Sequence, residues 1–296
     1  MPGLPDPLQH PQAAPQSARP GEVEVTGGRR ERLRAALPAA GRILRRIEVL
    51  AACASTSDEL RRRLSGDEAA AANGLVLVAR TQTGGRGRRA RDWWSGPPDT
   101  NLHLSLALPP PEPAEAGGLL AACAAAAAAE AAARRPAALK WPNDVLIAGR
   151  KVGGILSELP AASVCLVIGI GLNVGAAPPA AAAAAPAACL AEFAGRPLDP
   201  AAVLADLLAG LEERWCDYLD RGPDRLEEEF LLRLRRWAPF GVEAPDRPDL
   251  PRGPLLEFSV RRGLSWGGNE FRTTLAAGRL PALRPLPPPA APGAAP

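Results

Sequence analysis

Residues 84–95 have the composition of a loop that binds an anion. Their first eight positions hold three glycines and four arginines, and two tryptophans follow. Glycine lets the backbone approach a ligand closely, and each guanidinium presents a planar set of donors to carboxylate or phosphate oxygens. A solvated basic loop, or a grip on a nucleic-acid backbone, has the same composition. The segment therefore indicates an anion site without identifying the anion.

Two further groups of residues favour a specific ligand. Only Lys140 and Lys151 are lysines among the 35 basic residues, and a lysine supplies a compact point charge that arginine does not copy. Lys140 precedes Trp-Pro-Asn-Asp, which fixes its backbone, so we predict a functional lysine and not a solvated one. Residues 55–57 are three hydroxyl residues ahead of an acidic, arginine-rich helix. One hydroxyl caps that helix, and the others are available to a ligand.

Several other kinds of site are not expected. The five cysteines are scattered and odd in number, which is typical of reduced thiols and not of a disulfide frame or a zinc site. There are two histidines, and His103 lies in an expected strand in a packed or surface position, so we expect neither a histidine base nor a metal site. Walker, Rossmann and nucleophile-elbow motifs are absent. The net charge of +3 implies no general field for a polyanion.

A site rich in fixed cations and poor in nucleophiles suits adenylation. In that reaction a carboxylate attacks the α-phosphorus of ATP, and the enzyme must hold two anions together. Their repulsion at ~4 Å is worth about 4 kcal/mol at an effective dielectric of ~20. Lys140 and the arginines would cancel it, so that positioning and electrostatic stabilisation carry the rate without a covalent enzyme intermediate.

Hydrophobic periodicity and breakers predict the elements that must position these residues. Alanine/proline-rich residues 176–188 are expected to be a surface loop, residues 1–40 to be disordered, and residues 281–296 to be unstructured. Strands are expected at residues 42–50, 74–80, 101–108, 139–145, 151–158 and 164–174, with weaker candidates at 255–260 and 271–275; helices are expected to start at 55–60 and to span 118–135, 201–219 and 224–237.

Neither a membrane span nor a signal peptide is expected from the sequence. We find no apolar run that we judge long enough to cross a bilayer, and the N-terminus lacks the basic-then-apolar order of a leader. We therefore expect a soluble cytoplasmic protein without a membrane partner.

Taken together and in this order, the motifs resemble those of biotin protein ligases, of the type without an N-terminal DNA-binding domain. Each piece is weak alone, but the joint match is specific and covers roughly residues 44–237. The matching pieces are Ser55-Thr56-Ser57, Gln82, Gly85-Arg86-Gly87-Arg88-Arg89-Ala90-Arg91-Asp92-Trp93, Lys140-Trp141-Pro142-Asn143-Asp144, the segment from Lys151 to Glu158, and Gly169-Ile170-Gly171-Leu172-Asn173.

This resemblance implies the fold and the domain organisation. It implies an α/β (α+β) fold, with a mixed, largely antiparallel sheet and packed helices like those of class II synthetases. Residues 1–40 would be a tail, residues 41–237 the catalytic domain, and residues 238–296 a degraded or divergent C-terminal β region. That last region would hold at most part of a small β-barrel and end in disorder.

The resemblance also implies an activity. The enzyme would make biotinyl-5′-AMP from biotin and ATP with Mg²⁺, then transfer biotin to a lysine of the biotin carboxyl carrier domain of acetyl-CoA carboxylase or a related carboxylase. Nucleic acid is not an expected partner. Carried over by motif, the biotin contacts are Ser55, Thr56, Ser57, Gln82, Arg86, Gly87, Arg88 and Lys140; the ATP contacts are Arg88, Arg91, Lys140 and Asn173; the catalytic residues are Lys140 and Arg88; and no metal-ligating residue is implied.

Three departures from the family pattern leave alternatives open. Ser57 replaces an asparagine, Ala90 replaces a glycine at which a positive φ would now be strained, and residues 238–296 lack clear barrel strands. A lipoate or octanoyl transferase of the same superfamily, an inactive biotin-binding remnant, and a nucleic-acid-binding module are the competing hypotheses. A nucleic-acid module would bind with a steep salt dependence.

The glycine-arginine composition also predicts a loop that closes over its ligand, with Trp93 and Trp94 packing it. Proteolysis between Arg86 and Arg91 should be slower when biotin and ATP are both present, because closure buries the cleavage sites. Time-resolved peptide mapping measures this rate. Unchanged cleavage in the presence of both ligands would refute closure.

Overall fold

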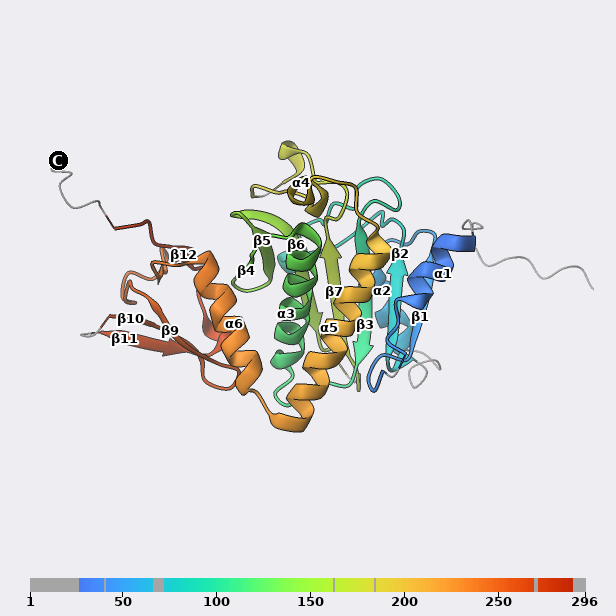
Figure 1. Cartoon of the computed structure of the whole chain (residues 1–296). Coiled ribbons are helices and arrows are strands. Elements are labelled where there is room, and N and C mark those ends of the chain that lie inside the picture. Colours follow the sequence, from blue (N-terminus) through green and yellow to red (C-terminus); the bar gives the residue numbers. More distant parts are fainter. Residues whose placement is uncertain are drawn as a thin grey trace, which may run out of the picture.

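The computed structural model describes residues 27–39, 41–65, 72–161, 163–183, 185–268 and 271–289. Within these residues, the main sheet has seven strands in the order β1-β2-β3-β7-β6-β5-β4 (Figure 1). Strands β1 and β2 run parallel, and every other neighbouring pair runs antiparallel. The expected mixed, largely antiparallel sheet is thus confirmed. Its strands are β1 (Arg46–Leu50), β2 (Leu75–Ala79), β3 (Leu102–Leu108), β4 (Ala137–Lys140), β5 (Asp144–Ile147), β6 (Arg150–Glu158) and β7 (Leu166–Leu172).

Both faces of the sheet are buried, because successive side chains of its central strands enter different hydrophobic clusters. In β2, Val76 and Val78 join the large cluster under helices α3 and α5, whereas Leu75 and Leu77 join a smaller cluster under α2. This is the two-residue period of a strand covered on both sides. The helices are α1 (Gly27–Ala35), α2 (Thr56–Leu64), α3 (Glu115–Ala133), α4 (Leu190–Ala194), α5 (Pro200–Arg221) and α6 (Asp224–Trp237), with short 3-10 turns at Arg88–Ala90, Ala180–Ala182 and Ala277–Arg279.

Helix α3 corrects the statement that no apolar run could cross a bilayer. By length and composition alone this 19-residue helix could span a membrane, since an 18-residue window of it has a mean hydropathy of 1.5. However, 72% of that window is buried inside the protein, where α3 lies between α5 and the sheet (Figure 1). Small side chains let the helix lie close to its neighbours. The composition therefore reflects a core helix.

The disordered tail expected at residues 1–40 is wrong for the part that the structure describes. Helix α1 begins at Gly27, and the buried side chains of Leu33 and Ala36 belong to the large hydrophobic cluster. Helix α1 packs against β1 and α5, and this tertiary packing stabilises a short arginine-rich helix whose composition alone favours disorder. Residues 1–26 lie outside the described residues.

Residues 238–268 and 271–289 also fold, although the sequence shows no clear barrel strands there. Leu264 and Trp266 are buried, so the region joins the large hydrophobic cluster through them. In this region β9 (Leu255–Ser259), β10 (Gly263–Gly267) and β11 (Arg272–Leu275) form one antiparallel sheet, and β8 (Val242–Glu243) pairs with β12 (Arg284–Pro285).

The strands expected at 255–260 and 271–275 are thus present. The other three were not predicted, because β8 and β12 have only two residues each and β10 has a glycine at both ends. Residues 290–296 lie outside the described residues.

One expected strand is in fact two. The segment 139–145 is interrupted after Lys140 by a turn, and β5 returns antiparallel from Asp144, with Lys140 opposite Asp144. Pro142 cannot donate a ladder hydrogen bond, which suits it to the turn. Lys140 therefore ends a strand and does not lie within one.

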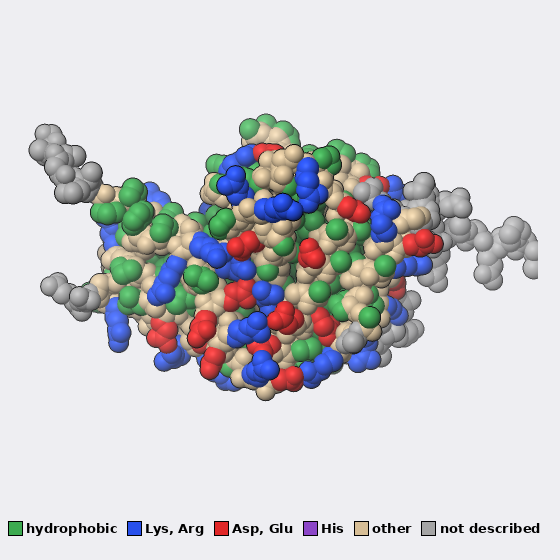
Figure 2. Space-filling model, in the orientation of Figure 1, with side chains coloured by type: hydrophobic (Ala, Val, Ile, Leu, Met, Phe, Trp, Pro, Cys, Tyr) green, Lys and Arg blue, Asp and Glu red, His purple; other side chains and the backbone are tan. Residues whose placement is uncertain are grey.

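Acidic and basic side chains are interspersed over the face that carries α5 and α6 (Figure 2). This agrees with the nearly balanced net charge of +3. All five cysteines are free thiols, as expected, and burial raises the pKa of Cys53 to about 11, so its thiol is unreactive at neutral pH.

His103 is packed inside the sheet and makes stability depend on pH. It is 2% exposed, and Nε2 lies 2.9 Å from the carbonyl oxygen of Ser95. Burial lowers the pKa of His103 to about 4, and this hydrogen bond opposes the effect only in part. The unfolded chain, with a histidine pKa of about 6.5, binds the proton first as pH falls.

We therefore expect the stabilisation from neutral His103 to be complete above pH 6.5 and to be lost as pH falls toward 4. The loss amounts to at most about 3 kcal/mol. Urea unfolding of the wild type and His103→Gln at pH 7.0 and 5.0 measures it. Between pH 7.0 and 5.0 the wild type should lose more of its free energy of unfolding than the variant does. An equal loss in the two proteins would contradict the assignment.

Candidate functional site

A cavity of about 580 Å³ lies on the face of the sheet opposite α3 and α5. The glycine-arginine loop (residues 84–95), the start of α2, the ends of β4 and β7, and a C-terminal segment meet there. All ten site residues that the sequence indicates line this one cavity: Ser55, Thr56, Ser57, Gln82, Arg86, Gly87, Arg88, Arg91, Lys140 and Asn173.

Part of the cavity lining is neutral and polar. Ser55 caps α2, its Oγ accepting from the amide of Asp58 at 3.4 Å. Gln82 Oε1 accepts from the Thr56 amide at 2.8 Å, which fixes the amide side chain. The Ser105 hydroxyl, from the middle of β3, lies 2.8 Å from Thr56 Oγ1 and 2.9 Å from Ser57 Oγ.

This hydroxyl cluster qualifies the expectation for Ser57. Its Oγ hydrogen-bonds to the hydroxyl of Ser105. It also packs so close to Gly169 that a Cβ on that residue would lie only 2.7 Å from it. Ser57 therefore lines the cavity while helping to orient its neighbours. Sequence reasoning missed Ser105, whose only signal is a hydroxyl in a mostly apolar strand.

The glycine-arginine loop is held by its own backbone and by an ion pair. The Gly87 amide donates to the Arg91 carbonyl at 2.7 Å, and Arg86 contacts Asp58 at 2.6 Å. Within this loop, Arg89 has the positive φ, at 56°. The strain that the sequence assigned to Ala90 is therefore carried by its neighbour instead.

Trp93 packs into a cradle made by two glycines. A Cβ at Gly171 would overlap the indole ring, and one at Gly154 would lie 3.1 Å from it. The expected close approach at the β6 glycines is thus made by this side chain. Trp93 Nε1 is buried, and no described residue accepts its hydrogen bond. An unpaired buried donor of this kind is costly unless a ligand or water accepts from it.

Another part of the cavity lining is cationic. Lys151 Nζ lies 2.6 Å from Asp144 Oδ1 and 5.5 Å from the centroid of the Trp93 ring. Burial lowers the pKa of Arg88, the charge of Arg89 lowers it further, and Asp144 opposes both. Lys140 lies opposite Asp144 in the β4–β5 ladder, so Arg88, Lys140 and Lys151, which all line the cavity, share this carboxylate as a neighbour.

Sequence reasoning did not place Lys151 or Asp144 in the site, although both lie in the quoted motifs. The register of the β5–β6 ladder brings Lys151 and Asp144 together. Asp144 pairs with Gly154, and a bulge between Val145 and Leu146 places Lys151 opposite Leu146, two residues from Asp144. The rarity of lysine in this chain was the available signal. The same rarity applies to Lys140, and both lysines line the cavity.

Two segments expected to be peripheral also line the cavity. Asn173 Nδ2 donates to the Ala188 carbonyl at 3.1 Å, which fixes the end of the alanine-rich loop against β7. Five residues of that loop and six of the C-terminal segment contribute apolar walls: Pro178, Ala182, Ala183, Ala185 and Ala187, and Ala277, Leu280, Pro281, Ala282, Leu283 and Gly278. Among the described residues, no group of three or more His, Cys, Asp or Glu side chains could hold a metal ion.

Residues 54–173, which include all ten predicted site residues, match the model of the biotin/lipoate A/B protein ligase family. The chain is 36% identical over 160 residues to the bifunctional ligase/repressor BirA of Bacillus subtilis, covering 51% of this chain and 49% of that protein. It is 38% identical over 155 residues to a biotin--[acetyl-CoA-carboxylase] ligase of Paracoccus denitrificans, covering 49% of this chain and 63% of that protein. The match thus spans less than two thirds of these relatives.

The similarity in structure is wider. The biotin protein ligase from Aquifex aeolicus, solved in complex with biotin and ATP, superimposes with a TM-score of 0.66 at 26% identity. The alignment covers 81% of this chain and 99% of that chain. The structural alignment therefore covers more of both chains than the sequence matches do.

The glycine cradle predicts how the loop responds to substitution. Gly171→Ala should displace Trp93, because a methyl group would overlap the indole ring. We expect faster proteolysis of residues 84–95 and a shift in tryptophan fluorescence. Gly84→Ala, in the same loop, is the matched control, since its added methyl would lie 3.6 Å from the nearest atom. Equal cleavage rates in the two variants would contradict the cradle.

Proposed function

We propose that this chain, whose residues 54–173 match the model of the biotin/lipoate A/B protein ligase family, is an ATP-dependent biotin ligase. It activates biotin as biotinyl-5′-AMP and transfers it to a lysine of a biotin carboxyl carrier protein. The observation that carries the proposal is one cavity lined both by neutral hydrogen-bonding side chains and by cations. The ureido ring of biotin is uncharged and polar, whereas its carboxylate and the triphosphate of ATP are anions, so the two kinds of lining match the two kinds of group.

The neutral part of the lining supports recognition of the ureido ring. The hydroxyls of Ser55 and Thr56 and the amide of Gln82 can each exchange hydrogen bonds with a carbonyl or N–H group. Their mutual contacts with Ser105 and the α2 backbone hold them in place before the ligand arrives. Such preorganisation lowers the entropy that binding must overcome.

The cationic part of the lining supports the adenylation step. A carboxylate oxygen of biotin attacks the α-phosphorus of ATP, a mixed anhydride forms, and pyrophosphate leaves with the bridging oxygen. Arg88, Lys140 and Lys151 offset the repulsion between the anions and stabilise the charge on the transferring phosphorus. Asp144 holds Lys151 at 2.6 Å and so fixes its ammonium group. Arg91 and Asn173 complete the wall that would face the nucleotide.

The second step needs no further protein nucleophile. The neutral ε-amine of the carrier lysine attacks the carbonyl carbon of the anhydride, an amide forms, and AMP leaves. Mg²⁺ enters as part of the nucleotide substrate, bound to its phosphates. We also propose a cytoplasmic location, since carboxylases and ATP would be met there.

Lipoate or octanoate transfer is the second candidate, because the family that matches residues 54–173 includes both kinds of ligase. Competition between biotin and lipoate for the protein separates the two. Lipoate lacks a ureido group, so the hydroxyl and amide lining predicts preference for biotin. Tight lipoate binding without biotin binding would favour the transferase.

We predict that the intact protein releases pyrophosphate with biotin and Mg-ATP and biotinylates an added carrier domain. Lys140→Ala and Lys151→Ala should each slow adenylation at least about 100-fold, because each removes a charge that stabilises the transition state. Arg247→Met, which removes an exposed cation paired with Asp249 outside the cavity, is the control and should retain the rate. Biotin binding by the wild type without pyrophosphate release would identify an inactive remnant instead.

A further inference from the structure

Helix α6 covers the outer edge of the main sheet. Strand β4 is the last strand in the sheet order, and α6 packs against it on one side and against β9 on the other (Figure 1). The four residues of β4 end in Lys140, which lines the cavity. Whatever fixes β4 therefore also fixes the backbone from which this lysine projects.

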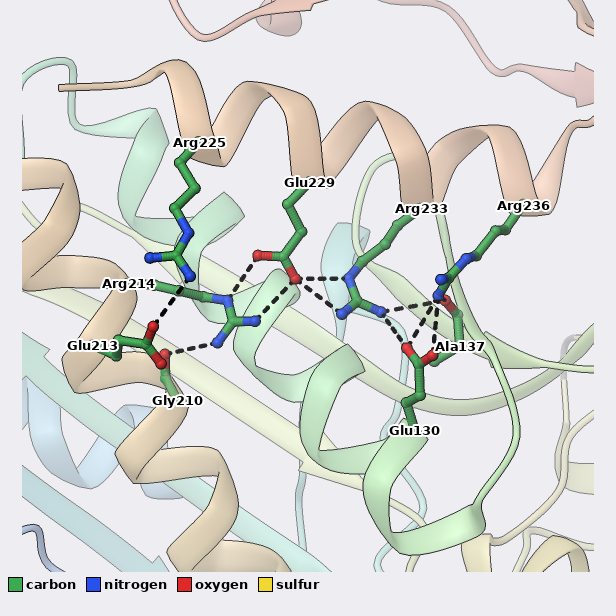
Figure 3. Close-up of polar contacts among 9 residues, drawn as sticks. All are labelled: Glu130, Ala137, Gly210, Glu213, Arg214, Arg225, Glu229, Arg233 and Arg236. Carbon is green, nitrogen blue, oxygen red and sulfur yellow. Dashed lines mark hydrogen bonds and ion pairs between the residues drawn. The ribbon is translucent and has the colours of Figure 1, made fainter. Parts of the chain in front are cut away.

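Two arginines of α6 hold the start of β4. The carbonyl oxygen of Ala137 accepts from Arg233 Nη1 at 3.3 Å and from Arg236 Nη1 at 3.2 Å (Figure 3). Both guanidiniums also contact Glu130 of α3 at 3.0 Å. An outward carbonyl of a short edge strand is thereby satisfied by charged donors, which form stronger hydrogen bonds than neutral ones.

The contact extends through a partly buried network, which we call the α6 network: Glu130, Arg214, Glu229, Arg233 and Arg236. Glu229 links Arg233, at 2.9 Å, to Arg214 of α5, at 2.8 Å (Figure 3). Burial alone would raise the pKa of Glu229, but the hydrogen bonds and charges of Arg214 and Arg233 hold it below its ordinary value. The side chain of Arg233 is only 8% exposed, so its charge needs these carboxylate partners to offset the cost of burial.

The end of β4 is held by the same helix. Phe230 of α6 meets Trp141, the residue after Lys140, edge to face at 6.2 Å between ring centroids. Phe230 also stacks at 4.7 Å on Phe258 of β9. One helix thus contacts the chain three residues before Lys140 and again one residue after it.

We infer that Arg233 is a positioning residue for Lys140, acting through the Ala137 carbonyl and β4. This inference rests on the proposed function for the role of Lys140, but the backbone effect does not. Arg233 touches neither the cavity nor a substrate group; its partners are Glu130, Glu229 and the backbone that carries the lysine.

The first test is hydrogen exchange by mass spectrometry on Arg233→Met without ligand. Amides of residues 138–147 should exchange at least about tenfold faster than in the wild type, because the edge strand opens locally. Arg225→Met is the matched control: it lies on the same helix, carries the same charge and pairs with Glu213 at 3.2 Å on the surface (Figure 3). Exchange that is equal in both variants would overturn the inference. Arg236→Met, with a half-buried side chain, provides a milder variant that should show the same local effect if Arg233→Met unfolds.

The second test is a double-mutant cycle on biotin affinity, measured by calorimetry below the melting temperature of every variant. Arg233→Met should weaken binding by about fivefold in the wild-type background and by less than about twofold in the Lys140→Ala background, since the two changes act on one contact. Equal weakening in both backgrounds would mean a merely structural role. Absence of biotin binding by the wild type would reject the proposed function, while the exchange experiment would still decide the positioning.

Discussion

Repulsion between two anionic substrates is the constraint on which the proposed site depends. A carboxylate and a triphosphate come together only where fixed positive charge surrounds them and water cannot reorganise. In this chain the charges come from separate segments: Arg88 from the glycine-arginine loop, Lys140 from the end of β4, and Lys151 from β6. The sheet brings these segments to one wall. The fold is therefore the means by which charges far apart in the sequence become neighbours.

Holding like charges together has its own demands. Lys151 is paired with Asp144, Arg86 with Asp58, and the charge of Asp144 partly offsets the effect of burial on Arg88. Each cation near the cavity thus has either a carboxylate nearby or partial solvent access. Gly154 and Gly171 have no side chain, which leaves room for the indole ring of Trp93. That ring packs against the ammonium group of Lys151. Charge, packing and backbone freedom are therefore coupled in the same few strands.

The residues that the sequence indicated for a site line one cavity, whereas elements at the periphery of the fold were predicted less well. Motif residues such as Gln82 and Asn173 line one cavity. They follow strands with clear hydrophobic patterns, so the elements that position them were predictable. What failed had weak local signals and depends on distant contacts. The α1 helix is ordered through Leu33 and Ala36, β10 through Leu264 and Trp266, and none of these partners is readable from local composition. The pairing of Lys151 with Asp144 required the β5–β6 register, which a sequence without the fold does not specify.

The most direct measurement is a crystal structure of the protein with biotin and a non-hydrolysable ATP analogue. The account predicts the biotin carboxylate and the α-phosphate side by side, with oxygens of each within about 3 Å of nitrogens of Arg88, Lys140 or Lys151. It also predicts the ureido ring against Ser55, Thr56 and Gln82. Ligands bound away from this wall, or a carboxylate and phosphate kept apart by it, would contradict the central claim.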